Sequence, residues 1–160
     1  MKNKTKDFIQ IAMVAAVYAV LTVAISPFSY GAIQLRFSEI LVLLCFYNKK
    51  YCISLTLGCA IANIFSPMAL FDIPFGTLAT LLSVIFICKS SRLWIASLFP
   101  TIFNAVIVGA ELYFALHEPF MISMATVALG EFIVVTVLGV PLFRLLEKNT
   151  YIMRLIGSTR

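Results

Sequence analysis

Residues 119–143 read PFMISMATVALGEFIVVTVLGVPLF, a run of apolar and small residues in which Glu131 is the single charged side chain. No turn residue beside Glu131 forces a break, so we expect one continuous helix with a carboxyl group near its middle. A helix needs about 20 largely apolar residues to cross the hydrocarbon core of a bilayer. The stretch therefore predicts a membrane-spanning helix that carries an acid inside the membrane.

The rest of the chain has the same apolar character. Of its 160 residues, 62% are hydrophobic and 12% are charged, whereas soluble domains carry about 25% charged residues. So few charges cannot cover so much apolar surface in water, which excludes both a soluble domain and a disordered chain. We expect an all-α integral membrane protein, with residues 1–160 forming a single transmembrane domain of six helices. The expected helices cover about 8–26, 35–47, 51–66, 74–88, 93–116 and 120–146.

The distribution of Lys and Arg indicates the orientation of these helices. If the N-terminus is cytoplasmic, Arg36 is the only one of the twelve Lys and Arg residues on the outer side, as expected from the preference of cations for the cytoplasmic side. Both termini are then predicted to be cytoplasmic. A cleaved signal peptide over residues 1–26 is the alternative, which the length of the apolar run disfavours. The predicted inner cations are Lys2, Lys4, Lys6, Lys49, Lys50, Lys89, Arg92, Arg144, Lys148, Arg154 and Arg160.

Several classes of function lack the residues that they would need. The net charge of +5 is spread over helix ends, which suits anionic lipid heads and does not predict nucleic-acid binding. The single histidine, His117, stands at an outer turn, and no phosphate-binding loop or nucleophile motif is present. We therefore expect no metal, no cofactor and no enzymatic activity. The four cysteines form no CxxC pair and are interpreted as small packing residues: Cys45, Cys52, Cys59 and Cys88.

The acidic residues are the informative polar groups. Glu39, Asp72, Glu111, Glu118 and Glu131 all fall on the predicted outer side or within the membrane, and Glu131 lies about 18 Å along its helix. An ionised carboxylate at that depth costs several kcal/mol unless it is paired or hydrated, so such acids are candidates for function. Glu118 is interpreted as a loop charge. A structural salt bridge is the alternative for the others.

Amides add to this polar set. Asn63 and Asn104 occupy positions where apolar residues are expected, and Asn104 shares a helix face with Glu111, seven residues further on. Amides can also simply hold helices together. Polar groups from several helices nevertheless predict a ligand cavity that opens outward and takes a donor-rich, cationic molecule. Aromatic residues near the outer rim either stack on the ligand or form an interfacial belt: Phe28, Tyr30, Phe71 and Phe75.

The first predicted helix carries a stripe of small residues. Ala12, Ala15, Ala16 and Ala19 make overlapping AxxxA patterns, which let another helix approach closely. The partner is either a second protein or another helix of this chain, and spacing alone does not distinguish the two.

Motifs along nearly the whole chain, from about residue 8 to 146, resemble those of the queuosine-precursor transporter family. A match to several of these motifs in one chain is more specific than a match to any one of them. The matching stretches are QLRFSE (34–39), ANIFSP (62–67), LFD (70–72), FGTLATLL (75–82), FNA (103–105), GAEL (109–112), GE (130–131) and LGVPL (138–142).

The resemblance implies a substrate-binding S component of an energy-coupling-factor (ECF) transporter, located in the bacterial cytoplasmic membrane as a six-helix bundle. Such a protein captures a 7-deazaguanine base of the prequeuosine type. The alanine stripe would meet a membrane coupling subunit that is driven by two ATPase subunits. The implied binding residues are Glu39, Glu111 and Glu131, with Asn63, Asn104, Asp72, Gln34 and Arg36 providing orientation and gating.

Two other functions stay open from the residues alone. A proton-coupled secondary transporter of a small cationic or nucleobase-like solute would use Glu111 or Glu131 as a proton relay, and is expected to show repeated halves, which the sequence lacks. A membrane enzyme would need a nucleophile and a base, or metal ligands, in convergent positions. We find no such set in the sequence.

Overall fold

The computed structural model describes residues 2–30 and 34–157, and within these ranges it is all-helical without strands. Four helices are long and apolar enough to cross a membrane: Lys4–Ala24, Ala69–Lys89, Leu93–Leu116 and Phe120–Glu147. The chain is therefore a multi-pass membrane protein, and the predicted all-α class is confirmed. Two shorter apolar helices, Phe37–Tyr47 and Tyr51–Asn63, span about 20 Å each and do not match a hydrocarbon core of about 30 Å. A count of six crossings stays a prediction.

The elements follow one another with short connections. In chain order they are α1 (Lys2–Ala24), α2 (Ser26–Ser29), the 3-10 helix η1 (Phe37–Leu43), α3 (Leu44–Tyr47), α4 (Tyr51–Asn63), α5 (Ala69–Lys89), α6 (Leu93–Ala96), α7 (Leu98–Leu116), α8 (Phe120–Glu131), the π-helix η2 (Phe132–Gly139), α9 (Val140–Glu147) and α10 (Thr150–Ile156).

Several expected helix boundaries are wrong, and the first helix begins at Lys2 where a start near residue 8 was expected. The segment expected as one α-helix over 35–47 is mostly 3-10 helix, with a short α-helical end. The helix expected over 51–66 ends at Asn63, and the one expected to begin at residue 74 begins at Ala69, so that Pro74 lies inside it. Because proline has no backbone N–H, α5 lacks the hydrogen bond that residue 74 would otherwise donate to the Leu70 carbonyl.

The long C-terminal helix runs without interruption from Phe120 to Glu147, as the sequence predicted, and Glu131 is buried within it. The hydrogen-bond pattern changes to that of a π-helix over Phe132–Gly139, directly after Glu131. π-Helical turns are rare in proteins, and those that occur are often at functional sites. The preceding helix, α7, ends at His117, which adopts a left-handed conformation with φ 57°. The chain then reverses through Pro119 into α8.

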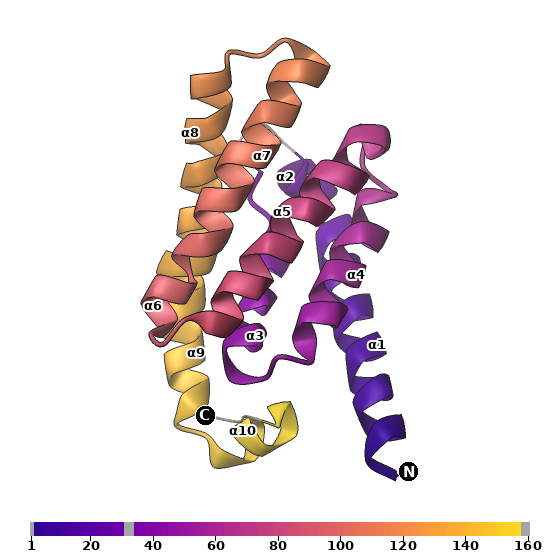
Figure 1. Ribbon diagram of the computed structural model, residues 1–160, viewed down its shortest axis with the longest axis vertical. Helices are drawn as coiled ribbons and strands as arrows, with labels where there is room; N and C mark the ends of the chain where they lie inside the picture. The colour runs from indigo at the N-terminus through magenta and orange to yellow at the C-terminus, as the bar shows by residue number, and fades with distance from the viewer. Residues whose placement is uncertain (1, 31–33, 158–160) are drawn as a thin grey trace.

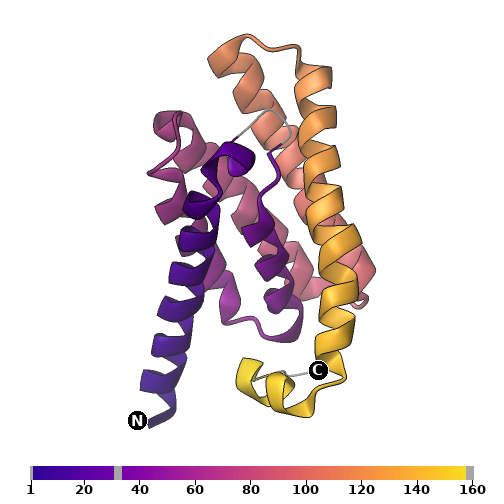
Figure 2. The ribbon, with the colours of Figure 1, turned by 180° about the vertical axis from the view of Figure 1, so that it is seen from behind.

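The helices follow one another around a bundle (Figure 1). α1 packs against α4, α4 against α5, α5 against α7, and α7 against α8. η1 packs against both α1 and η2, and Figure 2 shows its segment between α1 and the long C-terminal helix. Because η1 also contacts α4 and α5, its side chains face the interior of the bundle.

The two ends of the bundle differ. At one end, which we call the terminal end, Gln10 donates a hydrogen bond to the Leu155 carbonyl (3.1 Å), Asn48 donates to the Gly157 carbonyl (2.7 Å), and Lys50 pairs with Asp7 (2.8 Å). The α7–α8 turn lies at the opposite end (Figure 1). α1, which begins the described chain, and α10, which ends it, thus meet at the terminal end of the bundle. That this side is cytoplasmic stays a prediction, and Arg160 lies outside the described residues.

The distribution of apolar and acidic side chains between surface and interior is the reverse of that in a soluble protein. Large apolar side chains such as Phe8, Leu70 and Phe114 are exposed on the outside, where lipid would cover them. Four of the seven acidic residues are buried instead: Glu39, Asp72, Glu111 and Glu131. The fold therefore places most of its acidic groups inside the bundle.

Candidate functional site

Arg36 lies at the centre of the buried charges. Its Nη2 atom is 3.7 Å from Oδ1 of Asp72, and the two side chains are 4% and 3% exposed. Its Nε donates a hydrogen bond to the Ser29 carbonyl (3.2 Å), and its guanidinium lies 5.4 Å from the centre of the Tyr30 ring. Arg36 thereby connects α2, the segment before η1 and the first turn of α5.

Asp72 is fixed by the turn that joins α4 to α5. Ser66 donates a hydrogen bond to Asp72 Oδ2 and accepts one from the Met68 amide (3.1 Å). Asn63 donates to the Asp72 carbonyl (2.7 Å). Tyr30 donates to the Ala62 carbonyl (2.6 Å), which ties α2 to the same turn.

Because Gly76 has no side chain, the side chains of Asn63 and Arg36 can lie close to its backbone. A Cβ atom at residue 76 would lie 2.7 Å from Asn63 Nδ2 and 3.7 Å from Arg36 Nη1. The first distance is too short for any real contact, so an alanine would displace the amide. Gly76 belongs to the FGTLATLL motif, which is the sequence signal for this role, but it was not among the predicted site residues.

Glu39 lies deeper, on η1. Tyr18 of α1 donates a hydrogen bond to Glu39 Oε1, and Thr80 of α5 donates to the same oxygen at 3.5 Å. Tyr18 and Thr80 are fully buried. Glu39 Oε2 has no hydrogen-bond partner. Tyr18 is a site residue that sequence reasoning missed, because a tyrosine in an apolar helix resembles ordinary packing.

Glu111 and Glu131 complete the buried set. Glu111 is close enough to Asp72 and Arg36 to interact with both electrostatically, and Glu131 interacts in the same way with Glu39 and Arg36. The Glu111 oxygens have no hydrogen-bond partner apart from the Asp72 carboxyl group, and Oε2 of Glu131 has none. Asn104 Nδ2 is also buried without one. Unsatisfied buried polar groups are costly, which makes these atoms candidates for contact with a ligand.

A cavity of about 490 Å³ lies at the end of the bundle opposite the terminal end, within the range of small-molecule sites. Asp72 belongs both to this cavity and to the Arg36 pair, so the cavity adjoins the buried charges. The lining residues are Tyr30, Gln34, Ser66, Pro67, Met68, Asp72, Leu112, Leu116, Glu118, Ile122, Ser123 and Thr126.

The cavity corrects some expectations. Glu118 is an exposed loop charge, as expected, but it also lines the cavity, and so do Ser123 and Thr126, which the sequence did not single out. Gln34 lines it in a left-handed conformation with φ 49°. Of the four rim aromatics, Tyr30 lines the cavity, whereas the others are exposed on the surface: Phe28, Phe71 and Phe75. These three fit the interfacial belt better than a stacking role.

The predicted binding residues thus fall into two groups. Gln34 and Asp72 line the cavity. The other six are buried but do not line it: Arg36, Glu39, Asn63, Asn104, Glu111 and Glu131. Four carboxyl groups against one guanidinium make the buried set rich in hydrogen-bond acceptors and in potential negative charge. Such a set suits a ligand with several N–H donors and a positive charge.

The alanine stripe of α1 is divided by the fold. Ala15 and Ala19 are buried, and a Cβ atom at Gly58 of α4 would lie 2.8 Å from the Ala15 carbonyl. These two alanines therefore serve internal packing between α1 and α4, which corrects their assignment to a partner surface. Ala12 and Ala16 are exposed.

Three of the cysteines that were interpreted as small packing residues belong to the main apolar core or pack against it, and they also lie close together. Sγ atoms of Cys45, Cys52 and Cys88 lie within 4.8 Å of one another. Residues so distant in sequence are brought together because α3, α4 and α5 meet near the terminal end, which no local spacing reveals.

Comparison with known proteins gives a consistent result. A family model described as "QueT transporter" matches residues 8–148. The "Queuosine precursor transporter QueT" of Lactococcus lactis subsp. cremoris (strain MG1363) is 39% identical over 147 residues, which cover 82% of this chain and 86% of that protein. No solved structure matches the chain significantly.

Proposed function

The chain belongs to the QueT transporter family, and from that premise we propose that it captures a queuosine precursor, a 7-deazaguanine base such as prequeuosine, outside the bacterial cytoplasmic membrane. It does so as the substrate-binding S component of an ECF importer. A membrane coupling subunit and two ATPase subunits deliver the energy. The chain itself binds the substrate and catalyses no reaction.

The chemistry of the buried acids supports this substrate class. A guanine-like edge presents adjacent N–H donors, which one carboxylate accepts through two parallel hydrogen bonds. A prequeuosine-type base also carries an aminomethyl ammonium group, which a second carboxylate would neutralise. Glu111 and Glu131 are buried and offer unsatisfied oxygens for these two roles. Glu39, with one bonded and one unbonded oxygen, is the third acceptor.

Access to these acids runs through the cavity. Asp72 is shared by the cavity and the Arg36 ion pair, so the Arg36–Asp72 pair and the 64–68 turn that holds it form a gate between cavity and acids. Gln34, Asn63 and Asn104 would orient the base once it has passed. Behind this gate lie five buried residues that do not line the cavity: Glu39, Asn63, Asn104, Glu111 and Glu131.

The outward direction of the cavity follows from charge. Of the Lys and Arg residues that the structure describes, all except Arg36 are expected on the cytoplasmic side, which we assign to the terminal end. The cavity lies at the opposite end, which places its opening outside the cell. Ala12 and Ala16, the exposed members of the α1 stripe, offer the close-approach surface for a helix of the coupling subunit.

The buried carboxyl group of Glu111, which has no hydrogen-bond partner apart from the Asp72 carboxyl, carries this proposal. The experiment is a titration of the purified chain with prequeuosine, compared with Glu111→Gln. Loss of one charge-assisted hydrogen bond should weaken binding by about 1.5–3 kcal/mol, or about 10- to 150-fold. Equal affinity of the two proteins would reject the carboxylate site.

A proton-coupled secondary transporter is the second candidate. It is favoured by one observation: the buried Glu111 and Asp72 carboxyl groups interact directly with each other, an arrangement that suits a proton relay. Uptake that stops when the ATPase partners are deleted supports the importer. Uptake by the purified chain in vesicles, driven by a pH gradient alone, supports the relay.

A further inference from the structure

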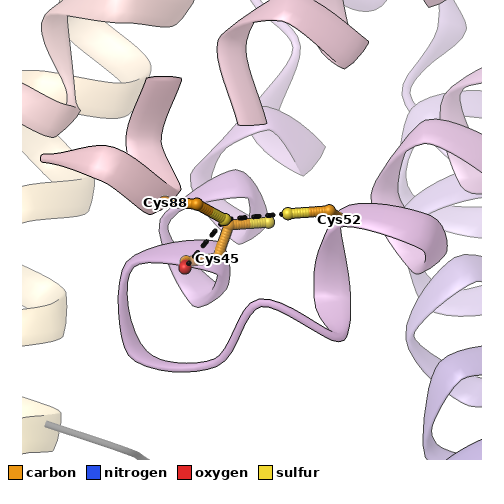
Figure 3. Close-up of side chains that lie close together, drawn as sticks. All are labelled: Cys45, Cys52 and Cys88. Carbon is orange, nitrogen blue, oxygen red and sulfur yellow. Dashed lines mark hydrogen bonds between the residues drawn. The ribbon is translucent and has the colours of Figure 1, made fainter. Parts of the chain in front are cut away.

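A second cluster of reactive side chains lies away from the candidate site. Cys45 is on α3, Cys52 is in the first turn of α4, and Cys88 is in the last turn of α5. Their three Sγ atoms lie within 4.8 Å of one another. The Cys52 and Cys88 sulfurs are 2.9 Å apart, and Cys88 Sγ donates to the Cys45 carbonyl at 3.4 Å. Figure 3 shows the three side chains pointing toward one another.

We propose that Cys45, Cys52 and Cys88 bind a soft, thiophilic metal ion such as Cu(I). Thiolates are the ligands that select such ions, with metal to sulfur distances of about 2.3 Å for Zn²⁺, a related ion. Three sulfurs at that distance from one centre lie about 4 Å apart. The observed spacing accommodates this arrangement after small side-chain rotations.

The third cysteine distinguishes a metal site from a disulfide. A disulfide between Cys52 and Cys88 would need no further sulfur, yet Cys45 is almost completely buried and reaches the same point. The cluster lies near the terminal end of the bundle, on the side that the cations assign to the reducing cytoplasm, where protein thiols stay reduced.

The surroundings suit an ion that is held firmly but can still enter. Cys45 belongs to the main apolar core, and Cys52 and Cys88 pack against it while remaining half-buried. The half-buried sulfurs provide the entry path, and the apolar shell excludes competing water. On binding, the thiols release their protons and the ion joins α3, α4 and α5.

The fourth cysteine provides a matched control. Cys59 is buried in the same helix as Cys52, but its sulfur accepts a hydrogen bond from Thr80 (3.2 Å) and donates to the Gly76 carbonyl (3.6 Å). It therefore belongs to a different environment and is outside the group of sulfurs that converge.

The test is an anaerobic titration of the purified, reduced full chain with Cd²⁺, whose thiolate complexes absorb in the ultraviolet through charge transfer. We expect one equivalent to bind. Cys45→Ser, Cys52→Ser and Cys88→Ser should each lower the affinity by more than the roughly 10- to 100-fold that loss of an outer-sphere partner costs. Cys59→Ser should bind as the original chain does.

Three results would overturn the site. These are the absence of the absorption band, unchanged affinity in Cys45→Ser, and a Cys52–Cys88 disulfide in protein that was prepared under reducing conditions. A second measurement uses the unmodified chain, so its result does not depend on whether the variants fold. One equivalent of Cd²⁺ should protect Cys52 and Cys88 from alkylation by a maleimide, as read by mass spectrometry, and unprotected thiols would reject the proposal.

Discussion

Nη2 of Arg36 lies 3.7 Å from Oδ1 of Asp72, and the two side chains are almost wholly buried. The pair joins the segment before η1 to the first turn of α5, at the boundary between the cavity and the deeper acids. Removal of one partner breaks this buried ion pair, which is costly. The pair is thus both a structural connection and the proposed gate to the binding site.

We expect Asp72→Leu to destabilise the protein by about 3–5 kcal/mol, because it removes the carboxylate that lies 3.7 Å from the buried Arg36 guanidinium. The double variant Arg36→Met/Asp72→Leu should recover most of this stability, since an apolar pair can replace a buried ion pair at little cost. Prequeuosine binding should remain lost in both. Chemical unfolding in detergent measures the first effect, and an Asp72→Leu protein as stable as the original would contradict the pairing.

Replacement of a buried acid should affect binding without unfolding the chain. Glu131→Gln should weaken prequeuosine binding by about 1.5–3 kcal/mol through loss of a charge-assisted hydrogen bond. Glu147→Gln is the matched control, because Glu147 accepts a hydrogen bond from Tyr47 at 2.8 Å, away from the cavity. Calorimetric titration compares the two. If both variants bind alike, Glu131 has no part in the site.

Gly76→Ala should damage the site through a single methyl group. Its Cβ would lie 2.7 Å from Asn63 Nδ2, and a forced shift of this kind costs about 1–3 kcal/mol. The shift would break the hydrogen bond from Asn63 to the Asp72 carbonyl. We expect binding to fall by at least about 10-fold. Adding Asn63→Ala should relieve the clash and restore stability but not affinity, and normal binding by Gly76→Ala would show that the Asn63 amide is not needed.

Two neighbouring alanines should behave differently when enlarged. Ala16 is exposed, so Ala16→Leu should leave folding and substrate binding intact while it blocks assembly with the coupling subunit. Ala15 packs against α4 near Gly58, so Ala15→Leu should destabilise the chain itself. Co-purification with the coupling subunit, together with unfolding curves, separates the two effects. An intact complex with Ala16→Leu would remove this face of α1 from the interface.

The predicted orientation is tested by labelling. In a background without the native cysteines, Lys49→Cys should react with a membrane-impermeant maleimide only after the cells are opened, whereas His117→Cys should react on intact cells. Both native side chains are exposed in the structure, so access should not limit the reaction. The reverse pattern would place the cavity on the cytoplasmic side.

The sequence was sufficient to predict the helical class, the continuous helix around Glu131 and the acids that the fold buries. These features depend on hydrophobicity and on charge within one segment, both of which are local properties. The 3-10 geometry of Phe37–Leu43 was not predictable, because it arises where η1 packs against α1 and η2. The same reason applies to Tyr18, to the space at Gly76 and to the three cysteines, whose roles depend on contacts between distant segments.

Native mass spectrometry of the chain purified from cells that synthesise or import queuosine precursors tests the central claim most directly. We predict that one 7-deazaguanine base co-purifies with the original protein and is absent from Glu111→Gln protein that is equally well folded. A chain that carries an unrelated compound, or a Glu111→Gln protein that retains the base, would contradict the assignment of the buried acids to this substrate.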